Sequence, residues 1–502
     1  MPQIFASGAG GDSQIVQTRV ERLPRLGGLV WSLPPKYVSL EGDKLVVDVP
    51  EEAYGADAVA SAFVPAEMLE NAPGFAFSVR AAGSSIAKPT KNYLGLKVQL
   101  HLLNRATGRE SWINCSAVTG DFEQREIRTE ASFAVVNPNF VELQLGLQGT
   151  SGRVEFDLST LRGAPSCGIF RLVNQDWRVR YPETVSGDSR RRGFMLPQRD
   201  PTADDFETLA SWGVTLVRYQ IVRNWSKNHD NQDLAEFNEW LEGKFDCLET
   251  TVLPLARKYG MKVVVDLHVT PGGRTESREM AMFWDATYAR EFVDIWRRIA
   301  ARFRDNADVI YGYDLVNEPK QLDRAPFDYW TLQRLAAEAV REIDPETPII
   351  IESNLMDAPS AFSYLSPLRM DNVIYQVHCY APTAFTHQGV HGRDVGLVWP
   401  DPDRKWDKDF IRATMAPVRE FELKHNAKIY VGEFSAIAWA EGAEKYLEDC
   451  MDVFEEYGWD WTYHAFREWS GWSLEHEGPD EKHMAPSADN PRKKAILAGL
   501  VR

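Results

Sequence analysis

The sequence has few cysteines, no long apolar run and no excess of positive charge. Five of its 502 residues are cysteines, and none share the short spacing of a zinc knuckle or a disulfide framework. No uninterrupted apolar stretch reaches the roughly 18 residues that a membrane-spanning helix needs. The formal net charge is −17, which argues against nucleic acid or an anionic membrane as a partner, because both are bound through Lys and Arg.

A secretory signal is also missing from the first residues. Residues 1–16 lack a charged start followed by an apolar stretch, and their glycines and small polar residues predict a flexible leader. We expect a secreted or periplasmic protein whose leader is not in this sequence, and a cytoplasmic location stays open. The oligomeric state is open as well.

Aromatic residues, in contrast, are plentiful: 16 Trp, 17 Tyr and 24 Phe. Many must lie in a hydrophobic core, but in the C-terminal two thirds Trp also gathers near expected loops. Flat, apolar ring faces suit a surface that binds sugar.

The first third of the chain has a hydrophobic period of two. Between residues 94 and 102, for example, Leu and Val alternate with Gly, Lys, Gln and His. This alternation is typical of strands with one buried and one solvated face. We therefore predict an all-β sandwich domain of jelly-roll type over residues 17–180.

From about residue 190 the period changes. Short apolar runs now alternate with longer segments of helical period, a pattern that predicts parallel strands covered by helices. Eight repeats predict closure into a (β/α)₈ barrel over residues 181–502. The expected strands are Arg192–Leu196, Val214–Gln220, Lys262–Leu267, Val309–Val316, Thr347–Ile351, Val373–Tyr380, Lys428–Phe434 and Trp459–Phe466.

Polar and titratable residues gather where these expected strands end, which is where barrel enzymes carry their chemistry. Two carboxylates are central, because Glu318 follows the fourth strand and Glu433 lies in the seventh, and those ends face each other across one barrel mouth. The other candidates at strand ends are Arg218, His268, Asn317, His378 and Tyr380.

The tripeptide Asn317–Glu318–Pro319, together with Glu433, resembles the retaining β-glycosidases that fold as (β/α)₈ barrels. With Arg218, His268, His378 and Tyr380 at their strand ends, the pattern resembles glycoside hydrolase family 5, the cellulase and mannanase family. The resemblance covers about residues 190–480 and leaves the N-terminal domain outside.

The resemblance implies that Glu318 is the acid/base and Glu433 the nucleophile. Retention needs two carboxyl groups roughly 5–5.5 Å apart, one protonated and the other ionised at the start. Two like charges at this distance push one pKa upward, which keeps the acid loaded.

The remaining residues receive supporting roles from the same resemblance. Arg218 and Tyr380 would hydrogen-bond the nucleophile, and Asn317 would bind the sugar 2-OH. His268 and His378 would contact sugar hydroxyls or the acid. No metal or organic cofactor is expected.

This family usually carries a Trp at the end of strand eight, which stacks under the sugar at the cleavage point. A direct match of the strand brings His464 to that position, and Trp469 and Trp472 follow a few residues later. We predict that Trp469 forms this floor of the first subsite, with Trp472 and His464 as alternatives.

The resulting functional hypothesis is a retaining hydrolase of β-linked glucan or oligosaccharide, similar to an endo-β-1,4-glucanase. A β-mannanase or an exo-acting β-glucosidase on the same barrel is the alternative within the enzymes. Outside them, the alternative is a non-catalytic carbohydrate-binding protein. The sandwich would either bind carbohydrate, through rings such as Tyr93, Trp112 and Phe140, or act as a scaffold.

Overall fold

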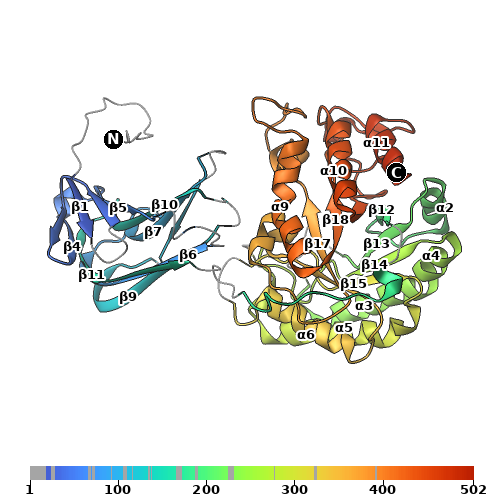
Figure 1. Ribbon diagram of the computed structural model, residues 1–502, viewed down its shortest axis with the longest axis horizontal. Coiled ribbons are helices and arrows are strands. Elements are labelled where there is room, and N and C mark those ends of the chain that lie inside the picture. The colour runs from blue at the N-terminus through green and yellow to red at the C-terminus, as the bar shows by residue number, and fades with distance from the viewer. Residues whose placement is uncertain are drawn as a thin grey trace. The chain divides into compact units, whose positions relative to one another are not determined.

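The computed structural model divides into two compact units, Met1–Arg171 and Leu172–Arg502 (Figure 1). The predicted leader, residues 1–16, lies outside the described residues. These run from 19 to 501 except for 24–28, 66–68, 70–73, 92, 106–109, 116, 134–135, 137, 166–171, 187–189, 224–230, 276–277, 322–324 and 391–392.

The first unit contains two antiparallel sheets. Six strands form one sheet, in the order β1-β2-β5-β10-β7-β8, and five form the other, in the order β3-β4-β11-β6-β9. In chain order the strands are β1 Arg19–Leu23, β2 Leu29–Leu33, β3 Val38–Glu41, β4 Lys44–Val49, β5 Asp57–Phe63, β6 Gly74–Ile86, β7 Gly95–Leu103, β8 Glu110–Asn114, β9 Gly120–Ser132, β10 Phe140–Gln148 and β11 Gly152–Pro165.

The two sheets share one hydrophobic core. Trp31 from the six-stranded sheet and Phe77 and Phe156 from the five-stranded sheet are buried in the same cluster. The period of two explains this packing, because alternate side chains of each strand point to the same face. The predicted all-β sandwich is confirmed, while its winding as a jelly roll stays a prediction.

The second unit is built on a closed barrel of eight parallel strands. Seven of the eight apolar runs contain one of these strands, and the fifth run overlaps its strand but ends one residue before the strand does, so the predicted (β/α)₈ barrel is confirmed. The strands are β12 Arg192–Met195, β13 Leu216–Gln220, β14 Lys262–Asp266, β15 Ile310–Asp314, β16 Ile349–Glu352, β17 Val373–Cys379, β18 Lys428–Phe434 and β19 Asp460–Tyr463.

Amphipathic helices cover the outside of the barrel (Figure 1). The helix Ala286–Phe303, for example, begins after the capping side chain of Asp285 and buries Phe292, Trp296 and Phe303. The longer helices are α2 Ala203–Ser211, α3 Leu234–Cys247, α4 Leu253–Tyr259, α5 Ala286–Phe303, α6 Tyr329–Arg341, α9 Lys408–His425, α10 Ala443–Tyr457 and α11 Pro491–Leu500, and the short ones are α1 Glu183–Ser186, α7 Asn354–Asp357 and α8 Thr383–Thr386.

The inside of the barrel is filled by side chains. A buried cluster joins Leu216, Val264, Tyr311, Ile350, Ile374 and Tyr430 from six consecutive strands. Among the described residues, no helix combines the length and the apolar character that a membrane span requires.

Candidate active site

A layer of polar side chains lies directly above this apolar interior. Because strand side chains alternate, the residue two positions after an inward apolar residue also points inward. Arg218 therefore follows Leu216, and Glu352 follows Ile350. Both polar residues are fully buried, so the layer belongs to the barrel interior at the C-terminal ends of the strands, where barrel enzymes act.

Glu433, in β18, is held by two donors. Nη1 of Arg218 donates to Oε1 of Glu433 at 2.6 Å, and Oη of Tyr380 donates to Oε2 at 2.8 Å. Burial raises the pKa of Glu433, but the positive influence of His378, His464 and Arg218 outweighs it and lowers that pKa below its usual range. Glu433 is therefore an anion at neutral pH.

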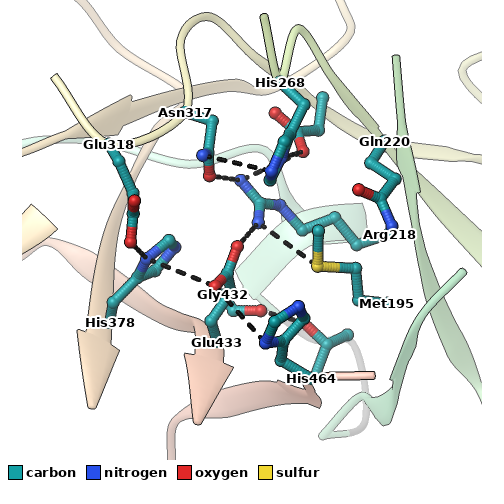
Figure 2. A network of polar contacts seen from close by, with 12 residues as sticks. Met195, Arg218, Gln220, His268, Asn317, Glu318, His378, Gly432, Glu433 and His464 are labelled. Atoms are coloured by element: carbon teal, nitrogen blue, oxygen red, sulfur yellow. Dashed lines mark hydrogen bonds and ion pairs between the residues drawn. The ribbon is translucent and has the colours of Figure 1, made fainter. Parts of the chain in front are cut away.

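Glu318 faces Glu433 across the barrel mouth, and His378 lies between them (Figure 2). Nδ1 of His378 is 3.2 Å from Oε1 of Glu318 and 3.8 Å from Oε2 of Glu433. One carboxylate oxygen of each Glu and one ring nitrogen of His378 all lie within 4.8 Å of one another. The two acids thus converge on a space the size of one reacting acetal.

The backbone of Glu318 is in the left-handed region, with φ of 52°. For a residue other than glycine, this backbone conformation costs about 1–3 kcal/mol, so it persists only where surrounding contacts stabilise it. Oε2 of Glu352 accepts the N–H of Glu318 at 2.6 Å, and Nη2 of Arg274 donates to its carbonyl at 2.9 Å. Both backbone polar groups of Glu318 are therefore fixed by side chains.

Arg218 also contacts three further acids. Its Nη2 is 2.8 Å from Oδ2 of Asp314, 3.1 Å from Oε1 of Glu352 and 3.2 Å from Oδ2 of Asp266. One guanidinium cannot balance four buried anions. Burial raises the pKa of Asp266 and of Asp314 to about 7 and that of Glu352 well above its usual value, whereas the pKa of Glu433 is lowered, so Glu433 is the most fully ionised of the four acids.

His268 and Asn317 lie beside Arg218 (Figure 2). Burial lowers the pKa of His268 to about 3, so its ring is neutral. Nδ2 of Asn317 donates toward Nε2 of His268 at 3.3 Å, which leaves the ring hydrogen on Nδ1, 2.7 Å from Oδ2 of Asp266. Oδ1 of Asn317 accepts from Arg218 at 3.0 Å. Hydrogen bonds thus fix the orientation of both side chains.

The residues after strand β19 differ in where they lie. Nδ1 of His464 is 2.8 Å from Oη of Tyr380 and 3.9 Å from Oε2 of Glu433, so His464 lies in the same site as Glu433. Trp469 packs edge-on against the rings of Trp439 and Trp472, with centroids 6.0 Å and 5.6 Å away. A role for Trp469 as the floor of the first subsite stays a prediction.

The sequence analysis did not single out Glu352 or its partner Gln376. Nε2 of Gln376 donates to Glu352, and its amide packs on Gly432, where an added Cβ would lie 2.4 Å from Cδ of Gln376. Glu352 obeys the strand-end rule that identified the other candidates, whereas Gln376 pairs with it from the middle of β17. The signal was therefore available, since Glu352 directly follows the apolar run of strand five.

Two groups of described side chains have metal-ligating atoms close together: Glu318, His378 and Glu433 in one, and Glu352, Asp357 and His378 in the other. In the first group, Arg218 and Tyr380 already donate to both oxygens of Glu433. In the second, Arg218 and Gln376 already donate to Oε1 of Glu352, and the N–H of Glu318 donates to its Oε2. Neither group has the chemistry of a resident metal site.

Comparisons with known proteins identify the family of the barrel. A family model described as cellulase (glycosyl hydrolase family 5) matches residues 183–470. The chain belongs to glycosyl hydrolase family 5. As a member of this family the protein is a glycoside hydrolase, which confirms the resemblance drawn from Asn317–Glu318–Pro319 and Glu433.

Two relatives match about half of this chain at moderate identity. Endoglucanase C of Acetivibrio thermocellus is 28% identical over 296 residues, which cover 52% of this chain and 83% of that protein. Cellodextrinase A of Ruminococcus flavefaciens is 28% identical over 263 residues, which cover 51% and 75%. A solved structure of a glycoside hydrolase has a TM-score of 0.50 at 21% identity and covers 62% of this chain and 99% of that one. It supports the fold alone.

Proposed function

We propose that this protein hydrolyses β-linked glucan or its oligosaccharides with net retention, with Glu433 as nucleophile and Glu318 as acid/base. The observation that carries the proposal is the approach of the two carboxylates, since one oxygen of Glu318 lies within 4.8 Å of one oxygen of Glu433. Retaining enzymes need carboxyl groups about 5–5.5 Å apart, whereas inverting enzymes need roughly 6.5–9.5 Å to admit a water molecule.

The reaction has two steps. In the first, an oxygen of Glu433 attacks the anomeric carbon while Glu318 gives its proton to the departing glycosidic oxygen, so one C–O bond forms as another breaks. In the second, Glu318 takes a proton from water, and that water displaces Glu433 from the anomeric carbon. Each carboxyl group ends the cycle in its starting state.

The surrounding residues prepare these steps. Arg218 and Tyr380 keep Glu433 ionised and fix both of its oxygens, which leaves the nucleophile little freedom to reorganise. Asn317, held by Arg218 at 3.0 Å, would bind the sugar 2-OH. His378, 3.2 Å from Glu318, would hold the acid toward the cleavage point.

The exact substrate is the most specific part of the proposal. Two relatives are named an endoglucanase and a cellodextrinase, so both polymeric and short β-glucans are candidate substrates. A β-mannanase or an exo-acting β-glucosidase remains the alternative. Loops after the strands decide between these. A polymeric substrate would also favour a location outside the cell.

A panel of polysaccharides and aryl β-glycosides, with products analysed by length and by NMR, tests this proposal. We expect β-glucan to be cleaved and the β-anomer to be released first. Release of the α-anomer first would contradict retention. A fast fall in viscosity would indicate internal cleavage, whereas short products released steadily from chain ends would indicate an exo enzyme.

We also propose that the sandwich domain, residues 17–180, is a carbohydrate-binding domain that accompanies the catalytic barrel of residues 181–502. A row of side chains crosses four strands on the outer face of the six-stranded sheet, in the order Trp112, His101, Glu142 and Phe63. Trp112 and Phe63, at the ends of the row, are 51% and 48% exposed. Three strand spacings span about 14 Å, which suits a short stretch of sugar chain.

The polar side chains of this face are held in place. Nε2 of Gln99 donates to Gln144 at 2.6 Å, and Nε2 of Gln144 donates to Glu142 at 2.9 Å. The ring of His101 stacks on Trp112 with centroids 4.5 Å apart. Fixed amides beside exposed rings can bind sugar at a low cost in side-chain entropy. Phe140 packs on Phe63 at 4.7 Å, so it supports one end of the row.

Binding to insoluble β-glucan tests this second proposal in a chain made inactive by Glu433→Ala. Trp112→Ala should weaken retention by about tenfold, as expected for loss of a ring that anchors a ligand. Tyr37→Ala, which removes another exposed ring in the turn before β3, is the matched control. Equal retention of both variants would support the scaffold role instead.

A further inference from the structure

The inference concerns His464, and it rests on the proposed role of Glu433 as nucleophile. His464 follows β19, is 14% exposed and lies 3.9 Å from Glu433 (Figure 2). We propose that His464 is a positioning residue for the nucleophile: as an imidazolium held by Glu468, it directs the hydroxyl hydrogen of Tyr380 onto Glu433.

The hydrogens at Tyr380 can be counted. A phenol has one hydrogen to donate, and Oη of Tyr380 donates it to Oε2 of Glu433 at 2.8 Å. Oη is also 2.8 Å from Nδ1 of His464, and toward that nitrogen it can only accept. Nδ1 of His464 must therefore carry a hydrogen.

The same count applies to the other ring nitrogen. Nε2 of His464 is 3.3 Å from Oε1 of Glu468, and a carboxylate only accepts. Glu468 is itself fixed, because Nε2 of Gln220 donates to its other oxygen at 2.7 Å. Nε2 of His464 must also carry a hydrogen, so the ring has two and is positively charged.

The groups around the ring agree with this charge. Burial opposes it, but the carboxylates of Glu433 and Glu468 outweigh burial and raise the pKa of His464 to about 9. The charged and titratable groups near the ring are Glu318, Tyr380, Glu433 and Glu468, with Arg218 and His268 beyond them.

The chain of donors makes Tyr380 dependent on His464. If His464 loses the hydrogen on Nδ1, that nitrogen becomes an acceptor and competes with Glu433 for the hydroxyl hydrogen of Tyr380. Glu433 then loses a donor and a nearby positive charge together. Loss of a hydrogen bond to a charged group corresponds to about a 10- to 100-fold loss of rate.

A direct test measures the charge of His464 without any substrate. The full chain, labelled with ¹³C at Cε1 of its histidines, is titrated by NMR, and the His464 signal is identified by its loss in His464→Gln. We expect a charged ring at pH 7 that titrates near pH 9, and a pKa at least one unit lower in Glu468→Gln. A neutral ring at pH 7 would overturn the proposal, whatever the enzyme hydrolyses.

A kinetic test uses a dinitrophenyl β-cellobioside, whose leaving group needs no proton from Glu318. The amide of an Asn reaches the position of Nδ1, and that of a Gln reaches the position of Nε2. His464→Asn should therefore keep the donor to Tyr380 and lose less kcat than His464→Gln, which should lose about 10- to 100-fold with little change in KM. Wild-type kcat/KM should also fall above about pH 9.

The two tests separate the possible failures. If His464→Gln retained full kcat, or if it lost no more than His464→Asn, the positioning role would be wrong. If no β-glycoside were hydrolysed while His464 titrated near pH 9, the proposed function would fail and the hydrogen-bond chain would stand. Circular dichroism of each variant establishes that it is folded.

Discussion

The buried carboxyl group of Glu352 accepts the backbone N–H of Glu318 at 2.6 Å. The two residues come from neighbouring strand ends, β15 and β16, and the contact joins the proposed acid to the strand next to it. Because Glu318 has φ of 52°, its backbone needs such support. The direction of the Glu318 side chain therefore depends on a residue that does not itself contact the acetal.

The first prediction concerns Glu352. Gln keeps one side-chain oxygen that can accept the N–H of Glu318, whereas Ala has none. We expect Glu352→Gln to retain kcat within about threefold and Glu352→Ala to lose about 10- to 100-fold, because a buried N–H loses its acceptor. Assays with an aryl β-cellobioside, together with thermal unfolding, measure both effects.

Substrates with different leaving groups distinguish a positioning role of Glu352 from a general disturbance of the site. If Glu352 acts through Glu318, the loss in Glu352→Ala should shrink with a dinitrophenyl leaving group, which needs no acid. An equal loss with both substrates would mean that the whole site is disturbed. Glu342→Ala, at the exposed end of α6, is the control and should change neither rate.

The second prediction concerns Glu433. Glu433→Ala should lower kcat at least about 10³-fold, because the covalent step has no nucleophile. Azide added to this variant should restore part of the activity on an activated aryl glycoside and give the α-glycosyl azide. The same anion added to Glu318→Ala should give the β-glycosyl azide. Full activity of Glu433→Ala without azide would remove Glu433 from the mechanism.

The third prediction concerns Arg218, which donates to Glu433 and Asp314 through different nitrogens. Lys keeps the charge but has three donors on one nitrogen, so Arg218→Lys cannot keep both contacts. The pKa of Glu433 should rise, and the acidic limb of kcat/KM should move up by about one pH unit. Arg334→Lys, a surface ion-pair residue of α6, is the control. An unmoved acidic limb would mean that Arg218 does not hold the nucleophile ionised.

Much of the barrel could be predicted from the sequence, because its strands are apolar runs separated by helices with a different period. The strand ends then brought Glu318 and Glu433 together without any knowledge of side-chain contacts. Glu352 was missed for a narrow reason. The predicted fifth strand ended at Ile351, one residue too early, so its strand-end position was not considered.

The segment after strand eight could not be predicted in the same way. Spacing offered His464, Trp469 and Trp472, but the direction of each side chain there depends on the backbone path after β19 rather than on a repeating period. The contact of His464 with Tyr380 joins residues 84 positions apart. Such a contact follows from the closure of the barrel, which no local pattern encodes.

The last prediction concerns stability and Asp314. Burial raises the pKa of Asp314 to about 7 despite the opposing charge of Arg218, and Asp266 adds to the rise. Between about pH 4 and 7 the folded protein therefore holds a proton that the unfolded chain has released. More protons on the folded state mean that the free energy of unfolding falls as pH rises, by about 1.4 kcal/mol per pH unit for this group.

Asp314→Asn removes this titration, so the difference in unfolding free energy between variant and wild type should grow by about 1.4 kcal/mol per pH unit between pH 5 and 7. Urea unfolding followed by tryptophan fluorescence measures it. Asp266, with a pKa of about 7, and His268, with a pKa of about 3, titrate in both proteins, so the difference reports the loss of Asp314 together with its interaction with Asp266. Asp409→Asn, with a side chain 84% exposed, should give a flat difference. A flat difference for Asp314→Asn too would mean that Asp314 is ionised beside Arg218, and that Glu433 shares its positive partner with a second anion.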